Sequence, residues 1–283
     1  MQKTSPITWF ITGTSQGFGL ELVRAALARG DKVIATSRTP EKIQAVFPNS
    51  AEQLLVLSVD LTSDVSVQEA VSTAIAQFGH IDVLVNNAGH GLLGAIQEVN
   101  AKEMEKLFQL NLFSLIRITQ VFLPHFRERK SGHIVNFSSI AGLTVLSTGL
   151  RIYNATKFAV EGLSQALAQE VAPFGIRVTI VEPGRFRTNF LGDSMVTSSK
   201  FIDAYLSLHE KFSTQRKSGH RSQPGDPALG AAAIIQAVTS EHPPLHLLLG
   251  SDAYDAAIKQ VDALKNEVIV QHAGTEAAVG VRS

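Results

Sequence analysis

The sequence predicts a doubly wound α/β fold, in which a mainly parallel sheet of seven strands is covered by helices on both faces. Short apolar runs alternate with longer stretches of helical periodicity along most of the 283 residues. The runs are apolar almost throughout, without the alternation of a strand that has one exposed face, as is typical of buried parallel strands. A glycine-rich turn directly follows the first run, and right-handed crossovers between the strands then give the doubly wound topology.

The predicted elements follow one another regularly from the N-terminus. The strands comprise residues 7–11, 32–37, 54–59, 83–86, 133–138, 177–182 and 245–249. The helices comprise residues 19–29, 40–47, 65–78, 102–127, 153–171 and 228–238. Gly30 follows the first helix, while Pro173 and Gly175 end the fifth, as expected of residues that interrupt helices. Asp226 and Pro227 are suited to the N-cap and first position of the last helix.

The composition is that of a globular chain and excludes several classes of function. Hydrophobic residues make up 45% and charged residues 18%, which is enough apolar material for a packed core. The formal net charge of zero gives no overall field that favours nucleic acid or an anionic membrane. The absence of cysteine excludes disulfides and cysteine-based zinc sites, and the scattered histidines form no metal-binding motif, so we expect no catalytic metal.

Domain organisation and location are also predicted from the chain. No segment approaches the roughly 18 consecutive apolar residues of a membrane helix, and the N-terminal apolar run is too short for a signal peptide. We therefore expect a cytoplasmic protein with a single domain over residues 1–283. Residues 188–225 are long and mixed and are expected to form a substrate-binding loop or lid, while residues 272–283 are small and polar enough to fray.

The turn after the first predicted strand is the first candidate binding site. Its glycines permit positive φ angles and a close approach of a ligand to the backbone. Free N–H groups at the start of the next helix form an anion site that fits a pyrophosphate, although a plain connector is the alternative. The residues expected to contact a dinucleotide here are Gly13, Thr14, Ser15, Gly17, Phe18 and Gly19.

Several motifs follow the glycine turn along the chain. The spacing Gly-x-x-x-Gly-x-Gly is followed by Asn86-Asn87-Ala88-Gly89, Asn111, Ser138-Ser139, Tyr153-x-x-x-Lys157 and Pro183-Gly184 with Thr188. By this set, in this order, the chain resembles the short-chain dehydrogenase/reductase family, in its shorter, single-domain branch. The resemblance implies a Rossmann-like fold, a nicotinamide cofactor and an oxidoreductase activity.

The end of the second strand indicates which nicotinamide cofactor is preferred. An acidic residue at this position favours NAD, whereas an arginine nearby accommodates the 2′-phosphate of NADP. The strand ends in Thr36-Ser37-Arg38, without a carboxylate. Arg38 and the hydroxyl of Ser37 can both bind a phosphate, so we predict NADP(H) over NAD(H). The alternative is that Arg38 is a solvated arginine at a strand end.

The resemblance implies further contacts with the cofactor. Asp60 and Leu61 match the pair that contacts adenine in the family, although Asp60 could instead begin the turn before the next helix. The other residues that the resemblance places at the cofactor are Asn87, Ala88, Gly89, Tyr153, Lys157, Pro183, Gly184 and Thr188. Taken locally, the Asn-Asn-Ala-Gly turn is also compatible with a simple strand exit.

Tyr153 and Lys157 are the candidate acid/base pair. Four positions apart on a helix, they lie on one face, one turn apart, which is equally compatible with an ordinary helical turn. A nearby positive charge favours the phenolate and lowers the pKa of tyrosine from its usual value of about 10. The resemblance assigns Tyr153 as the proton donor and acceptor, and Lys157 as the group that tunes it and anchors the ribose.

Ser139 and Asn111 complete the candidate catalytic set. Neighbouring residues on a strand point to opposite faces, so Ser138 and Ser139 are expected to differ in role. The family's serine precedes two residues and a glycine, which matches Ser139 and Gly142 and implies that Ser139 binds the substrate oxygen. The resemblance implies that Asn111 holds a water in a relay to the lysine, while a satisfied structural asparagine is the alternative.

The segments around these residues are apolar, which favours a hydrophobic substrate. The expected pocket residues are Leu143, Thr144, Val145, Ile152, Phe186, Phe190 and Leu191, and Phe212 is among the residues of the 188–225 loop expected to close over them. We therefore predict hydride transfer between NADP(H) and a hydrophobic ketone or aldehyde, giving the corresponding alcohol. The alternatives are a noncatalytic NADP-binding sensor on the same fold and a methyltransferase, which would explain the glycine turn but not the later motifs.

Three further expectations concern residues outside this set. His90 is expected to be a loop histidine or pocket wall. Arg185 and Arg187 are expected to be solvated or to face phosphate, and contact with an acidic substrate is the alternative. The helices at residues 102–127 and 153–171 are apolar over more than one stripe. Because a surface helix needs one such stripe, the second stripe suggests subunit contacts, and the resemblance implies that these two helices pair in a homodimer or homotetramer.

Overall fold

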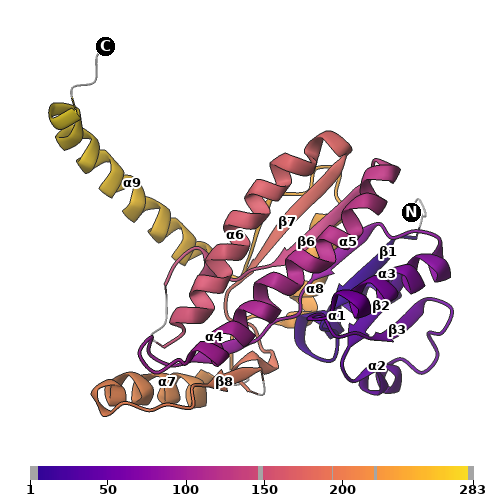
Figure 1. The fold of residues 1–283 in the computed structure, drawn as a ribbon, viewed down its shortest axis with the longest axis horizontal. Helices are drawn as coiled ribbons and strands as arrows, with labels where there is room; N and C mark the ends of the chain where they lie inside the picture. The colour runs from indigo at the N-terminus through magenta and orange to yellow at the C-terminus, as the bar shows by residue number, and fades with distance from the viewer. Residues whose placement is uncertain (1–5, 146–148, 193, 220–221, 280–283) are drawn as a thin grey trace.

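The structure confirms the doubly wound α/β fold. It is a computed structural model that describes residues 6–145, 149–192, 194–219 and 222–279. Its central sheet has seven parallel strands in the order β3-β2-β1-β4-β6-β7-β9 (Figure 1). The strands are β1 (Thr8–Thr12), β2 (Lys32–Ser37), β3 (Leu54–Ser58), β4 (Val83–Asn86), β6 (Gly132–Phe137), β7 (Ile176–Pro183) and β9 (His246–Leu249). Each predicted strand is present, with ends displaced by no more than one residue.

Helices cover both faces of the sheet. One face carries α1 (Gly17–Ala28), α2 (Pro40–Val46) and α8 (Pro227–Val238), and the other carries α3 (Asp64–Phe78), α5 (Ser114–Arg129) and α6 (Arg151–Val171). Consecutive residues of a strand point to opposite faces, so the neighbours Trp9 and Phe10 belong to different apolar clusters. This double burial explains why the strands are apolar almost throughout.

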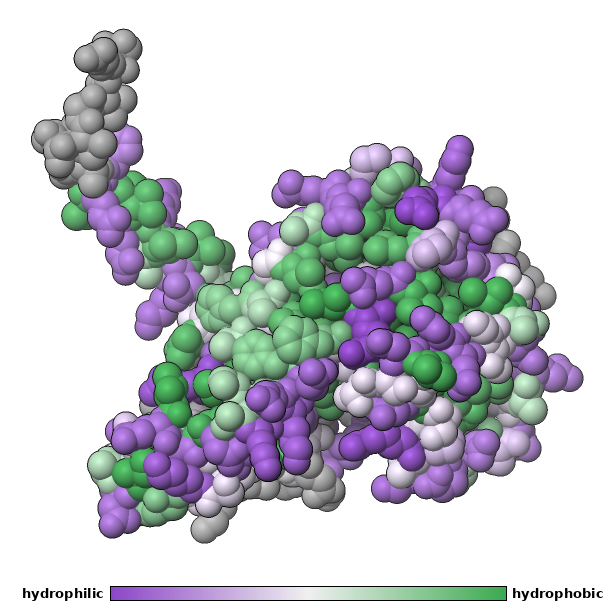
Figure 2. Space-filling model, in the orientation of Figure 1, coloured by the Kyte–Doolittle hydropathy of each residue, from purple (hydrophilic) through white to green (hydrophobic). Residues whose placement is uncertain are grey.

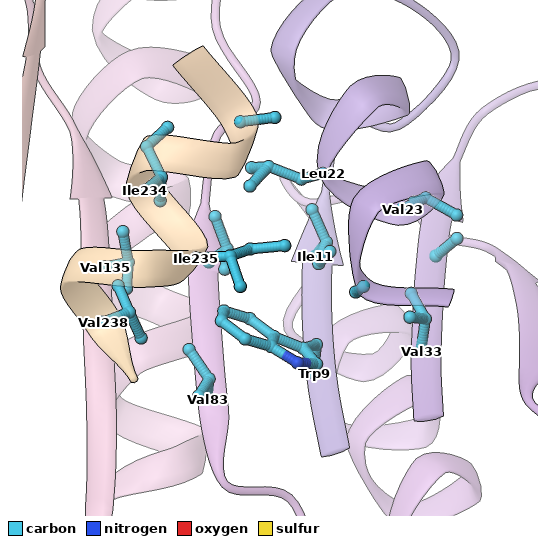
Figure 3. Packing of buried hydrophobic residues seen from close by; sticks show 14 of the residues in the cluster. Trp9, Ile11, Leu22, Val23, Val33, Val83, Val135, Ile234, Ile235 and Val238 are labelled. Atoms are coloured by element: carbon cyan, nitrogen blue, oxygen red, sulfur yellow. The ribbon is translucent and has the colours of Figure 1, made fainter. Parts of the chain in front are cut away.

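Trp9 is the largest side chain that the core buries completely. Figure 3 shows its ring between the strands and α8, beside Ile235 and Val83. The indole nitrogen is not left unpaired, because Nε1 donates a hydrogen bond of 2.9 Å to Asp31 Oδ2. The ring therefore fills the space under α8 and also fixes the start of β2 through Asp31.

The strand order reverses at β1, which places the binding crevice. β1 pairs with β2 on one side and with β4 on the other. In open α/β sheets, ligands bind beyond the carboxyl ends of the strands where the order reverses. The turns that carry Gly13 and Asn87 follow β1 and β4, so both motifs lie at this crevice.

The helix predicted over residues 102–127 is interrupted around Asn111. The observed run consists of α4 (Ala101–Phe108), a π-helical turn (Gln109–Phe113) and α5. π-Helical turns are rare and occur mostly at functional sites. No segment was expected to be apolar enough to span a membrane. The helical run Ala101–Arg129 is nevertheless long and apolar enough to do so by length and composition alone, because it contains an 18-residue window of mean hydropathy 1.2. Phe122 and Phe126 pack this helix onto the sheet, as in the core of a globular protein.

Residues 188–225, predicted as a loop, contain ordered elements. These are the 3₁₀ turns Asn189–Leu191 and Asp203–Tyr205, the strand β8 (Met195–Thr197) and the helix α7 (Leu206–Gly219). β8 pairs in parallel with β5 (Gly91–Leu93) and forms a second, two-stranded sheet. The buried carboxylate of Glu98 fastens the segment to the body, because its Oε1 lies 2.9 Å from both the Ile202 amide and His209 Nε2.

The C-terminal helix α9 (Ser251–Val279) extends away from the sheet, as Figure 1 shows. The tail was expected to fray from residue 272, whereas the helix continues to Val279; residues 280–283 lie outside the described part. Apolar residues such as Ile258 and Val261 are exposed along α9, and green patches mark this helix in Figure 2. Phe113 and Phe158 are exposed on the helices expected to form subunit contacts, and the homo-oligomer stays a prediction.

Replacing Trp9 with alanine is expected to lower the free energy of unfolding by about 3–5 kcal/mol, because the change removes a buried ring and leaves a cavity. Urea denaturation followed by circular dichroism measures the loss. Val46→Ala, at an exposed position of α2, is the control and should change the free energy by less than about 0.5 kcal/mol. A similar small loss for Trp9→Ala would contradict the packing described here.

Candidate active site

Tyr153 and Lys157 lie together in the first two turns of α6, both buried. The Lys157 Nζ is 5.8 Å from the centre of the Tyr153 ring, as expected for residues one turn apart. The same Nζ donates a hydrogen bond of 2.8 Å to the carbonyl of Phe137, the last residue of β6. The lysine thus joins the catalytic helix to the end of the sheet and keeps two further N–H donors.

Burial dominates the pKa values of both groups. It raises the pKa of Tyr153 to about 12, and the hydrogen bond from Ser139 opposes this rise only in part. It lowers the pKa of Lys157 to about 8, against the charge of Glu161, which raises it. The sequence argument that Lys157 brings the tyrosine pKa down is therefore outweighed in this structure by desolvation of the phenolate.

The two serines after β6 have separate contacts, as the alternation along a strand predicts. Ser139 caps the 3₁₀ turn Ile140–Gly142 by accepting from the Ala141 amide at 3.1 Å, and its side chain bonds to Tyr153. Ser138 is buried and its hydroxyl faces the carbonyl of Lys157 at 3.5 Å. Ser139 is thus the serine beside the tyrosine hydroxyl.

Asn111 sits in the π-helical turn and connects the loop after β4 to α6. Its Oδ1 accepts from the His90 amide at 3.0 Å, and its Nδ2 donates to the His90 carbonyl at 2.9 Å and to Thr156 Oγ1 at 3.2 Å. The side-chain amide is satisfied by protein groups, which agrees with the structural alternative. The relay through a water stays a prediction.

His90 lies in the loop after β4, directly before β5. Its pKa is lowered by burial first and then by the charges of Arg38 and Lys157. A neutral imidazole in this position agrees with a wall residue. Its backbone, held by Asn111, carries the structural role.

The turn after β1 has the close backbone approach that a dinucleotide site requires. Gly13 has a φ of +69°, and a Cβ there would lie 2.8 Å from the Ala88 Cα; a Cβ on Gly19 would lie 2.6 Å from Asn87 Nδ2. That Nδ2 donates to the carbonyls of Thr12 and Gly13 at 2.9 and 3.0 Å. Asn87 and Ala88 therefore lock the turn to β4, in addition to any contact with a cofactor.

The start of α1 is free to bind an anion. Its N-cap residue, Gln16, makes no side-chain hydrogen bond to the first turn, so the helix has no internal cap. A hollow of about 340 Å³ adjoins this turn, lined by Gln16, Gly17, Glu21, Arg187, Thr188, Asn189 and Pro227. Thr14 contributes differently, because its amide and its hydroxyl both bind the carbonyl of Thr36. The backbone of the turn fits a pyrophosphate of a bound dinucleotide.

The end of β2 presents an unpaired positive charge. Arg38 is exposed and has no hydrogen bond or ion pair within the described parts of the chain, yet it is near enough to lower the pKa of Asp60 and of His90. Ser37 Oγ accepts from the Thr39 amide at 3.0 Å, which shapes the turn around the arginine. Asp60 Oδ1 accepts from the amide and hydroxyl of Thr62, so it begins a turn, as the local alternative has it.

The apolar wall beside Tyr153 combines residues that the sequence indicated with residues that it did not. Phe190 lies there, with its ring centre 5.3 Å from that of Tyr153, and the other expected residues in the same cluster are Ile152, Leu191 and Phe212. The members that the sequence did not indicate include Leu92, Leu93, Leu107, Leu150 and Met195. The pairing of β5 with β8 brings them together, and the apolar run Gly91–Leu93 after the asparagine motif was the available signal.

The other predicted pocket residues lie elsewhere. Phe186 packs against Phe18, with ring centres 4.8 Å apart, in the core beneath α8. Leu143 packs against the first turns of α9, and Val145 is exposed. Their contact with a substrate stays a prediction, and apolar character alone does not tell which of two adjoining clusters a side chain enters. Phe18 itself fills the core with its ring, so only its backbone faces the glycine turn.

The segment after β7 is held by specific contacts. The Gly184 amide donates to the Leu249 carbonyl at 2.9 Å, and Thr188 Oγ1 accepts from the Phe190 amide at 3.3 Å. Arg187 donates to the carbonyls of Gln223 and Pro224 and pairs with Asp226, while Arg185 lies 3.5 Å from Asp252. Arg187 thus holds this segment to the turn before α8, while Arg185 is largely exposed, and contact of either arginine with a phosphate or a substrate stays a prediction.

Known proteins share this arrangement. A family model described as short chain dehydrogenase matches residues 8–197. The chain is 36% identical over 257 residues to "Oxidoreductase BOA17" of Botryotinia fuckeliana (strain B05.10), with 90% of this chain and 93% of that protein covered. It is 34% identical over 262 residues to "Retinol dehydrogenase 8" of Homo sapiens, with 85% and 80% covered. The chain belongs to the short-chain dehydrogenase/reductase family and is an oxidoreductase.

Solved structures add support for the fold and the cofactor class. A short-chain dehydrogenase from Streptomyces avermitilis has a TM-score of 0.88 and 40% identity, covering 99% of this chain and 100% of that chain. A 3-ketoacyl-(acyl-carrier-protein) reductase from Brucella melitensis complexed with NADH has a TM-score of 0.72 and 26% identity, covering 87% and 98%. ElxO with NADP bound has a TM-score of 0.70 and 26% identity, covering 86% and 96%. A nicotinamide cofactor is thus supported, and the methyltransferase alternative falls away.

Gly19→Ala is expected to weaken the binding of NADPH or NADH by roughly tenfold or more, because the new methyl group would displace Asn87 and with it the glycine turn. A fluorescence titration with the reduced cofactor measures the dissociation constant. Gly162→Ala is the matched control, since a Cβ at that position of α6 meets nothing within 4 Å. Unchanged cofactor binding in Gly19→Ala would contradict a cofactor site at this turn.

Proposed function

We propose that this protein is an NADP(H)-dependent enzyme that interconverts a hydrophobic ketone or aldehyde and the corresponding alcohol. The observation that carries the proposal is the hydroxyl pair of the half-buried Ser139 and the buried Tyr153, which lies beside Lys157 and the Phe190 ring. A carbonyl oxygen at this pair would accept two hydrogen bonds while its carbon faces the cofactor crevice. Such donors stabilise the charge that develops on the oxygen during reduction.

The residues divide the proton chemistry between them. When bound, the nicotinamide cofactor supplies the hydride for reduction and accepts it in oxidation. The Ser139 hydroxyl orients the substrate oxygen, and the Tyr153 hydroxyl donates its proton to that oxygen. With a pKa of about 12, Tyr153 is protonated at neutral pH and ready to act as an acid. The Lys157 ammonium stabilises the phenolate that this transfer leaves.

The preference for NADP(H) rests on the charge at the end of β2. A 2′-phosphate placed there would meet the unpaired guanidinium of Arg38 and no carboxylate of β2. Charge-assisted hydrogen bonds of this kind are the strong ones, particularly when an arginine binds a phosphate. If Arg38 were only a solvated arginine at a strand end, its unpaired charge would have no role.

The substrate class follows from the wall beside the tyrosine. Phe190, Met195 and Phe212 are apolar, and the segment that carries them folds directly over the Tyr153 side of the crevice. Small-molecule sites of this composition favour apolar ligands with a few placed polar groups. The similar human protein is named for retinol, which is an alcohol with a large apolar body.

The double variant Ser37→Asp with Arg38→Leu is expected to lower the ratio of kcat/KM for NADPH to that for NADH by at least about tenfold, since it replaces an attractive charge with a repulsive one. Steady-state kinetics with one apolar ketone and both cofactors measure the ratio. Arg127→Leu, at an exposed arginine in the last turn of α5, is the control and should leave the ratio unchanged. An unaltered ratio in the double variant would refute the NADP(H) assignment.

Tyr153→Phe is expected to lower kcat by roughly 10²–10⁴-fold while NADPH binding changes little, because only the proton donor is lost. The assay uses a panel of apolar ketones with NADPH and NADH, together with a binding titration. Tyr254→Phe, at an exposed tyrosine of α9, is the control. Cofactor binding by the wild-type protein without turnover of any carbonyl would favour the noncatalytic sensor instead.

A further inference from the structure

Three ionisable groups meet one helical turn after Lys157 on α6. They are Glu161 on α6, Glu182 near the end of β7 and His246 at the start of β9, and one donor atom of each lies within 4.8 Å of the others. Glu161 is 4% exposed and Glu182 is 0% exposed, whereas the imidazole reaches the surface. His246 Nδ1 lies 2.6 Å from Glu182 Oε1 and 3.8 Å from Glu161 Oε2.

The two carboxyl groups cannot both carry a full negative charge easily. Both Glu161 oxygens and Glu182 Oε2 are buried without a hydrogen-bond partner in the described residues. Ser138 and Glu182 are near enough to influence the pKa of Glu161, but neither satisfies its oxygens. Burial raises the pKa of both carboxyls, and two adjacent carboxyls that desolvation disfavours as anions hold one proton between them.

Glu161 lies one helical turn after Lys157 on α6. The two residues are four positions apart on α6, both buried, which puts them on one face of the helix. Gly142 marks how tightly this region is packed: a Cβ there would lie 2.9 Å from the Lys157 carbonyl and 3.0 Å from Glu161 Cγ. The negative charge of Glu161 raises the pKa of Lys157 against the effect of burial.

We propose that Glu161 is a positioning residue for the proposed reaction, one that keeps Lys157 in its ammonium form, and that Glu182 and His246 set how much negative charge Glu161 carries. The proposal rests on the proposed roles of Tyr153 and Lys157. Glu161 touches neither substrate nor cofactor and acts through the lysine. When the shared proton resides on Glu182, Glu161 is an anion and Lys157 stays charged; when it resides on Glu161, the lysine loses that support.

The charged groups that face Glu161 come from each element packed around it. Lys157 lies on its own helix, Glu182 on β7 and His246 on β9, while the end of β6 contributes only the neutral hydroxyl of Ser138. The carboxylate at the start of α9 is engaged elsewhere, since Asp252 accepts from the Arg185 amide at 2.8 Å. Among the described residues, the balance of charge at Glu161 is therefore set by Lys157, Glu182 and His246.

The test compares Glu161→Gln with Glu182→Gln in the pH profile of kcat/KM. We expect Glu161→Gln to move the alkaline limb to lower pH by roughly half a unit to one unit, because the lysine loses a neighbouring anion. Glu182→Gln should move it the opposite way, since Glu161 then ionises without a competing carboxyl. Glu170→Gln, exposed on the same helix, is the control and should not move the limb. A loss of kcat without displacement, or the same displacement in both variants, would overturn the proposal.

A second measurement keeps the proposal testable if no carbonyl is turned over. NMR titration of ¹³Cε-labelled lysines follows the pKa of Lys157 without any turnover, with Lys157→Arg used to assign the signal. The same opposite displacements are expected, and their absence would overturn the inference independently of the proposed activity. The alternative is that Glu161, Glu182 and His246 bind a metal ion, which calorimetric titration with Mn²⁺ or Zn²⁺ tests. Stoichiometric binding by the wild type that is lost in Glu161→Gln would also overturn the proposal, because a cation would cancel the charge on Glu161.

Discussion

The close approach of two backbone turns, one after β1 and one after β4, is the constraint on which the site depends. The Thr12 hydroxyl accepts from the amides of Asn87 and Ala88 at 3.0 and 3.1 Å, and the Asn87 side chain returns hydrogen bonds to the first turn. The approach is possible only because Gly13 carries no side chain toward Ala88. It aims the uncapped start of α1 into the crevice where the strand order reverses.

The same contact extends to the acid/base pair. The loop after β4 is held at His90 by Asn111, whose Nδ2 also reaches Thr156. Thr156 lies on α6 between Tyr153 and Lys157, so the position of the pair is tied to the position of the glycine turn. The π-helical turn gives Asn111 this reach, which a regular helix would direct differently. The cofactor crevice and Tyr153, the proposed proton donor, are in this way parts of one hydrogen-bonded framework.

Much of this framework could be predicted from the sequence, and the reasons are local. Buried parallel strands leave continuous apolar runs, so the seven strands were placed to within a residue. The family motifs indicated Ser139, Tyr153 and Lys157, which the fold brings together. The part of the pocket wall that comes from β5 and β8 could not be predicted, because it depends on the pairing of Gly91 with Met195, far apart in the chain. Desolvation was missed for the same reason: the shift of the Tyr153 pKa depends on everything packed around the ring.

Among the described residues, the two-stranded sheet of β5 and β8 makes no strand pairing with the seven-stranded sheet. The segment that shapes the pocket wall therefore meets the Tyr153 helix through side-chain packing, such as that of Phe190 on Tyr153, and not through a shared sheet. Side chains of Asn189–Leu191, β8 and α7 can change size or polarity while the sheet and the Tyr153 helix keep their geometry. The buried carboxylate of Glu98 joins this segment to the rest of the protein, together with Glu103, which accepts from the Ser199 amide. Substitutions in this segment can therefore change which substrate is bound without changing the fold of the central sheet.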